Sequence, residues 1–83
     1  MYYFLKLVNP DNTEQTFKKI NHKDAHNEIN KVLKLYGFDK DIKLNTFHNI
    51  LSRPGLMPVS LRWLISNNKL TISKFVNEKP LSF

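Results

Sequence analysis

The sequence predicts a small α+β domain with the order strand, strand, helix, helix, helix, strand. Three observations predict this class: an aromatic and aliphatic N-terminal segment before a turn sequence, an amphipathic helical pattern over residues 23–36, and an alternating pattern over residues 69–76. The chain has 83 residues, which is enough for one hydrophobic core and short for two. We therefore expect a single domain over residues 1–83.

Residues 2–8 and 13–20 predict an N-terminal β-hairpin. Residues 2–8 are aromatic, aliphatic or β-branched, which favours a strand. In the following Asn9-Pro10-Asp11-Asn12, proline fixes φ at the second turn position. Asn12 tolerates the left-handed conformation that a three-residue hairpin loop with a bulge requires. The returning strand then places Phe17 opposite Leu5.

The next segment predicts a helix over about residues 23–36. Asn21 is a suitable N-cap, and Asp24 places a negative charge in the first turn, where it favours the helix dipole. Gly37 can take the left-handed cap, with Phe38 contacting Leu33. The apolar face repeats at helical spacing and consists of Ala25, Ile29, Val32, Leu33 and Tyr36.

Two shorter helices are predicted after this one. The stretch NTFHNILSRPG, residues 45–55, predicts a helix whose N-cap is Asn45 or Asp41. The helix is expected to end at Arg53, because a residue before proline is disfavoured in the helical conformation. A third helix is predicted over VSLRWLISNN, residues 59–68, with Pro58 in its first turn. Asn67 and Asn68 are expected to terminate it. The expected buried residues are Leu44, Phe47, Ile50, Leu51, Leu61, Leu64 and Ile65, with Val59 and Trp63 as a flanking pair.

The C-terminal strand, residues 69–76, is expected to add to the hairpin, because a two-stranded hairpin is marginal by itself. The tail 77–83 contains Pro80 and is expected to fray or to pack through Phe83. The three helices together predict a helix-turn-helix-like unit, a likeness of architecture that carries no sequence motif.

The chain is basic and contains no cysteine. Thirteen Lys and Arg against seven Asp and Glu give a net charge of +6, and the pI of about 9.7 is typical of nucleic-acid-binding domains. A solvated lysine surface explains the same charge. Without cysteine, disulfides and thiolate zinc sites are excluded, which favours an intracellular protein in the cytoplasm, or in the nucleoid or nucleus if bound to DNA. No apolar segment is long enough to span a membrane, so no membrane partner is expected.

The second helix is the main candidate for nucleic-acid binding, with DNA favoured over RNA. Asn can bond to adenine and Arg to guanine through paired hydrogen bonds, while Ser, Thr and Lys can hold phosphates. An ordinary solvated helix surface has similar residues, and this alternative stays open. The predicted nucleic-acid-binding residues are Lys43, Asn45, Thr46, His48, Asn49, Ser52, Arg53, Arg62 and Lys69.

Other functions have weaker signals. No phosphate-binding glycine loop or nucleophile motif occurs, so we expect no enzyme, no catalytic residues and no cofactor. His22 and His26 are spaced as paired metal ligands but lack a third ligand in sequence, so no metal is expected. Aromatic residues such as Tyr2 and Trp63 can stack on single-stranded bases, although a small core uses most of its aromatics for packing.

The alternative function is a small accessory module, of phage or viral type, that binds and inhibits or adapts a larger host protein or nucleoprotein complex. Size and composition suggest it, and an exposed apolar patch around Leu56, Met57 and Trp63 would favour it over nucleic-acid binding. The oligomeric state does not follow from the sequence.

Overall fold

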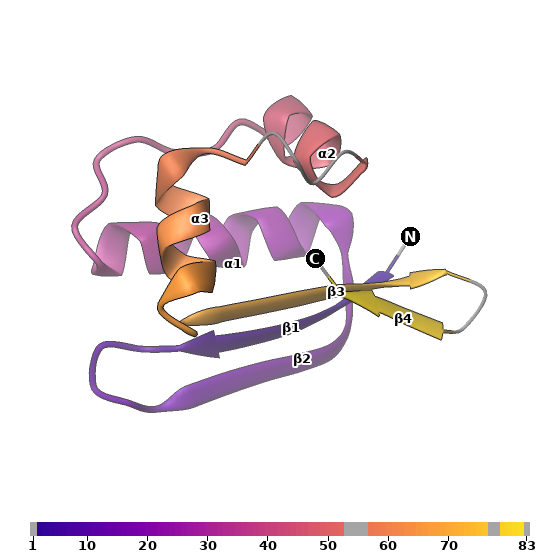
Figure 1. The fold of residues 1–83 in the computed structure, drawn as a ribbon, viewed down its shortest axis with the longest axis horizontal. Helices are drawn as coiled ribbons and strands as arrows, with labels where there is room; N and C mark the ends of the chain where they lie inside the picture. Colours follow the sequence, from indigo (N-terminus) through magenta and orange to yellow (C-terminus); the bar gives the residue numbers. More distant parts are fainter. Residues whose placement is uncertain (1, 53–56, 77–78, 83) are drawn as a thin grey trace.

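A computed structural model describes the backbone of residues 2–52, 57–76 and 79–82, and the side chains of residues 2–51 and 57–73. Within these residues, a four-stranded antiparallel sheet lies against three helices, so the predicted α+β class is confirmed. Figure 1 shows all three helices on the same face of the sheet. The elements are β1 (Tyr2–Val8), β2 (Glu14–Asn21), α1 (His22–Leu35), α2 (Leu44–Ser52), α3 (Val59–Ser66), β3 (Leu70–Val76) and β4 (Lys79–Ser82).

The predicted hairpin is confirmed, including its one predicted cross-strand pair. Leu5 pairs with Phe17 across β1 and β2. Asn12 has φ +68°, the left-handed conformation that the loop requires. Its amide N–H donates to the Asn9 carbonyl, and the Asn9 amide in turn donates to the Thr13 carbonyl. The turn sequence therefore determines where the chain reverses.

Helix α1 begins and ends with the predicted caps. The Asn21 side chain accepts a hydrogen bond from the Asp24 amide at 2.8 Å. Gly37 has φ +86°, its amide donates to the Lys34 carbonyl, and the Phe38 amide donates to the Leu33 carbonyl. These two bonds satisfy carbonyls of the last turn and define the glycine-dependent helix end known as the Schellman motif.

Helix α3 ends in the same way with asparagine in place of glycine. Asn68 has φ +57°, its amide donates to the Ile65 carbonyl, and the Lys69 amide donates to the Leu64 carbonyl. The expected stop at Asn67 and Asn68 is confirmed. Pro58 precedes the helix as its N-cap instead of lying in its first turn.

The C-terminal strand adds to the hairpin beside β1, giving the sheet order β2-β1-β3-β4. Leu5 pairs with Ile72, so β1 is a central strand. The expected fraying of the tail is wrong, because residues 79–82 form β4, which pairs with β3 in the register Val76 with Lys79 and Phe75 with Pro80. The alternative, packing through Phe83, lies outside the described residues. A proline is tolerated in this strand because β4 lies at the edge of the sheet, where one side of the strand has no partner to bond.

The core fills the layer between the sheet and the helices. One prediction for it is wrong: Leu44, expected to be buried, is 41% exposed, because it is the first residue of α2 and lies at the end of the apolar stripe. The buried apolar residues are Tyr3, Leu5, Leu7, Ile20, Ala25, Ile29, Val32, Leu33, Ile42, Phe47, Ile50, Leu51, Leu61, Leu64, Leu70 and Ile72.

Candidate nucleic-acid interface

Helix α2 presents a polar side to solvent and fixes its other side in the core. Phe47, Ile50 and Leu51 are at most 2% exposed. Asn45 and Asn49, four residues apart, lie on the same side of the helix and opposite the buried stripe. The predicted residues exposed on or next to α2 are Lys43, Asn45, Thr46, His48 and Asn49.

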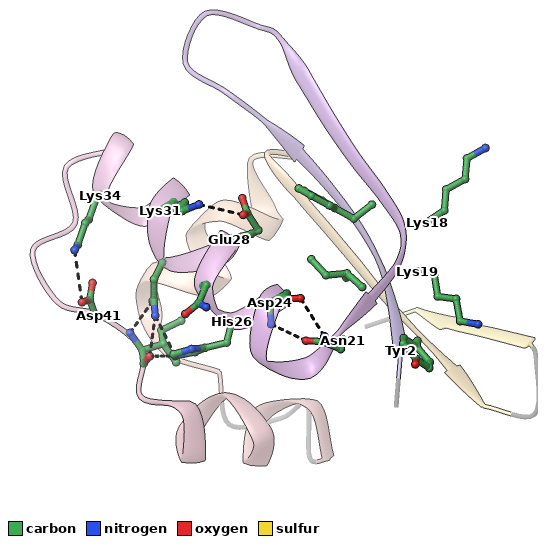
Figure 2. Close-up of a pocket in the computed structure, with 15 residues that line it drawn as sticks. Tyr2, Lys18, Lys19, Asn21, Asp24, His26, Glu28, Lys31, Lys34 and Asp41 are labelled. Carbon is green, nitrogen blue, oxygen red and sulfur yellow. Dashed lines mark hydrogen bonds and ion pairs between the residues drawn. The ribbon is translucent and has the colours of Figure 1, made fainter.

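Asparagine and histidine side chains of α1 hold the segment that leads into α2. The Asn30 amide group donates to the Ile42 carbonyl at 3.0 Å and accepts from the Ile42 amide at 2.9 Å. The His26 imidazole Nε2 also bonds to the Ile42 carbonyl, and dashed lines beside His26 in Figure 2 mark this group of bonds. Because Ile42 lies two residues before α2, the contact sets where the polar helix begins. The predicted caps are wrong: α2 starts at Leu44, so Asn45 lies inside the helix, and Asp41 pairs with Lys34 instead.

Aromatic contacts fix the side of α2 that faces the start of α1. The His22 ring lies 5.1 Å from the Phe47 ring and 5.2 Å from the His48 ring, measured between centroids. The Tyr3 hydroxyl lies 3.3 Å from His22 Nδ1. Burial lowers the pKa of His22, and the neighbouring imidazoles of His48 and His26 lower it further, while a hydrogen bond to the Leu44 backbone acts in the opposite direction. His48 is therefore exposed but also packs against His22.

The structure separates Lys69 from the rest of the predicted site. The Lys69 carbonyl accepts from the Val8 amide at the far end of β1, whereas α2 packs beside Tyr3 and His22 through Phe47 and His48. Tyr3 and Val8 are about 16 Å apart along the strand, at roughly 3.3 Å per residue. The structure therefore does not bring the Lys69 backbone next to α2, because the fold places the end of α3 at the opposite end of the sheet.

The remaining predicted residues lie on α3 or outside the described part. Arg62 is exposed on α3. Arg53 and the side chain of Ser52 lie outside the described residues. Apart from Lys69, the described cations among the predicted nucleic-acid-binding residues are Lys43, which precedes α2, and Arg62 on α3.

Two lysines that the predicted site omitted lie together on another surface. The register of β1 and β2 shifts between Tyr3, which pairs with Ile20, and Leu5, which pairs with Phe17. Lys18 and Lys19 therefore both lie opposite Phe4 in a β-bulge. Figure 2 shows both side chains extending from the sheet away from α1. The charge pattern indicates Lys18 and Lys19 as candidates for a basic surface along the strands, but strict strand alternation would have placed them on opposite sides of the sheet.

Helix α3 carries an apolar patch, which we define as Val59, Trp63, Tyr36 and Phe38. Val59 is 71% exposed and Trp63 is 41% exposed. The Trp63 ring lies 5.7 Å from the Tyr36 ring and 5.5 Å from the Phe38 ring. Phe38 and Val59 also line an open groove between the 38–43 segment and the starts of α2 and α3. An exposed apolar patch was expected around Leu56, Met57 and Trp63. Trp63 belongs to the observed patch, whereas Met57 is partly buried against the core and Leu56 lies outside the described residues.

The histidines of α1 have structural partners. His26 bonds to Ile42, and His22 packs between Tyr3 and Phe47. Across the described residues, no group of three or more His, Cys, Asp or Glu side chains is arranged to hold a metal ion.

No helix in the described part of the chain is both long and apolar enough to cross a membrane. Comparisons with protein-family models, with curated proteins and with solved structures found no match to this chain.

Proposed function

We propose that the protein is a small, non-enzymatic nucleic-acid-binding protein that contacts DNA through the polar side of α2. The observation that carries the proposal is the orientation of this helix: Asn45 and Asn49 face solvent one turn apart, while Phe47, Ile50 and Leu51 hold the opposite side in the core. A helix fixed in this way presents its polar groups without a large loss of side-chain and backbone entropy on binding.

The dimensions and chemistry of α2 suit the major groove of DNA better than the deep, narrow major groove of RNA. The helix has 9 residues, which gives a length of about 13 Å. Asn45 and Asn49 are then the candidates for paired bonds to adenine, and Thr46 and Lys43 the candidates for phosphate contacts. In this proposal α1, α2 and α3 act as the helix-turn-helix-like unit, with Arg62 and the net charge of +6 adding attraction to the backbone.

The test separates the phosphate contribution from the base contribution. Selection from a random duplex pool supplies a preferred site, and titrations then compare variants on that site and on random DNA. Lys43→Ala is expected to weaken binding to all duplexes similarly, whereas Asn49→Ala or Arg53→Ala should cost about 1–3 kcal/mol on the preferred site and much less on random DNA. Neutralising about four phosphates would give a slope of log affinity against log salt near −3.6.

Asn27→Ala is the matched control, because it removes an exposed asparagine from α1 instead of α2. It should bind both duplexes like the wild type. If no sequence is enriched, or if Asn49→Ala and Asn27→Ala behave alike, then the polar side of α2 is an ordinary solvated surface and the proposal is wrong.

A second candidate function, a protein-binding accessory module of phage or viral type, is supported by the α3 apolar patch. Exposed aromatic and aliphatic groups packed on one another are typical of the centre of a protein interface. Capture from the host should then recover one protein in stoichiometric amount after nuclease treatment. Val59→Ser, a change at a 71% exposed side chain, should abolish this capture without changing the melting temperature. Capture that disappears with nuclease, or that survives Val59→Ser, would count against this function.

A further inference from the structure

We propose that the face of the sheet opposite the helices binds single-stranded nucleic acid. On this face, Tyr2 and Phe4 would stack on bases, and Lys6, Lys18 and Lys19 would pair with phosphates. We call this surface the open sheet face. The open sheet face does not include α2, so this proposal goes beyond the function proposed above and is tested independently of it.

Strand alternation defines the open sheet face. Tyr3, Leu5 and Leu7 of β1 are buried beneath the helices, so the intervening residues of this central strand point to the other side. Figure 1 shows that α1, α2 and α3 all lie on the first side. Cross-strand pairing adds Thr71 from β3 and Thr16 and Glu14 from β2 to the open sheet face, while Ser73 of β3 is buried there.

The aromatic groups of this face lie next to one another along β1. Tyr2 is 47% exposed, and Phe4 follows it on the same side, about 7 Å further along the strand. The Lys19 Nζ atom lies 4.7 Å from the centroid of the Tyr2 ring. The ammonium lies over the face of the ring, so a stacked base would take its place and leave Lys19 to contact the neighbouring phosphate.

The charges of this face favour a polyanion. The bulge brings Lys18 and Lys19 to the same side of the sheet, and Figure 2 shows both with Tyr2 on the side away from α1. Lys6 pairs with Glu14 at 3.5 Å, but both side chains are well exposed, at 41% and 55%. Such a surface pair is weak and can be replaced by a phosphate contact. Among the described side chains of the face, three lysines therefore stand against one glutamate.

A single strand fits this face better than a duplex or a second copy of the chain. Stacking requires the flat side of a base, which a duplex keeps inside its own stack and a single strand exposes. Two copies packed through this face would bring lysines of equal charge together, which is unfavourable. The hydroxyl groups of Thr16 and Thr71 are both exposed and can donate to phosphate or sugar oxygens.

The experiment measures fluorescence anisotropy of a labelled oligothymidylate and the matching oligouridylate, each of about 12 nucleotides. Tyr2→Leu keeps an apolar side chain but removes the ring, and should weaken binding by roughly 5- to 150-fold, the equivalent of one lost stacked base. The double variant Lys18→Gln/Lys19→Gln should lower the salt slope by about 1.4, at roughly 0.7 per phosphate contact on a single strand.

The matched control is Lys31→Gln/Lys34→Gln. It removes the same net charge from exposed lysines that belong to α1 instead of the sheet, as Figure 2 shows. The proposal requires this control to bind like the wild type, and requires all variants to keep the wild-type melting temperature. An equal loss in both double variants would mean that only net charge matters, and would overturn the proposal.

Two further outcomes would also overturn it. One is single-strand binding that is absent, or that Tyr2→Leu leaves unchanged. The other is a wild-type dimer in sedimentation that Tyr2→Leu converts to monomer, which would identify the face as a contact between copies. Asn49→Ala separates the two proposals: it should leave single-strand binding unchanged, so a loss of duplex recognition by this variant bears on α2 alone.

Discussion

Replacing Asn30 by alanine should destabilise the domain far more than the same change at Asn27. Both asparagines belong to α1, so the change in helix propensity is the same. The Asn30 side chain holds the backbone of Ile42 by two hydrogen bonds, of 2.9 and 3.0 Å. Asn27 is exposed. The comparison therefore isolates the connection between α1 and the segment that leads into α2.

The expected loss of stability follows from the Ile42 backbone groups that lose their hydrogen-bond partner in Asn30→Ala. Each of the two hydrogen bonds contributes about 1 kcal/mol net, and an Ile42 amide without its partner costs a further 1–3 kcal/mol to the extent that water cannot reach it. Water has some access, since Asn30 is half-buried, and the Ile42 carbonyl keeps its bond to His26. Alanine also gains a few tenths of a kcal/mol in helix propensity. We expect a net loss of about 2 kcal/mol for Asn30→Ala and a change within about 0.5 kcal/mol for Asn27→Ala.

Urea denaturation at low temperature provides the measurement, and a loss of this size should lower the melting temperature by roughly 8–16 °C. Hydrogen exchange of α2 amides should accelerate in Asn30→Ala and stay at the wild-type rate in Asn27→Ala, because the lost bonds hold the segment before α2. If the two variants differ by less than about 0.5 kcal/mol, the bonds to Ile42 contribute nothing to stability and the reasoning fails.

Three further predictions concern backbone conformation and pH. Gly37→Val should cost about 1–2 kcal/mol in urea denaturation, because Gly37 has φ +86°; an unchanged midpoint would contradict the helix end described above. Asn68→Gly should raise the melting temperature, because φ is +57° at this position and glycine adopts that conformation without strain. Asn67→Gly should lower it, because φ is −90° there. Equal effects of the two substitutions would contradict this difference in backbone conformation. Burial and the neighbouring imidazoles lower the pKa of His22, so the unfolded chain binds this proton at higher pH than the folded chain does. Stability should therefore be full above the ordinary histidine pKa of about 6.5 and fall as the pH drops from there toward the folded pKa. His22→Gln should flatten this part of the profile, and a profile that His22→Gln leaves unchanged would exclude His22 as its source.

The sequence alone determined the features that depend on neighbouring residues. The reversal at Asn12, the Asn21 cap and the Gly37 helix end each need one side chain and a few local backbone groups, so residue identity is sufficient to predict them. The polar side of α2 was predictable for the same reason, because Phe47 and Ile50 mark its buried stripe by spacing alone.

Only the tertiary structure decided how these local pieces combine. Pro80 argued against a strand, yet β3 offers an edge at which β4 can pair, and this depends on residues distant from the tail. The bulge that places Lys18 and Lys19 on one side arises because β2 gains a residue relative to β1, which no pattern within β2 reveals. Lys69 was a candidate site residue because of its charge, without a predicted position, and the packing of α3 and β3 places its backbone at the opposite end of β1 from α2. Charges are attracted or repelled across space, and the path of the chain through the core sets those distances.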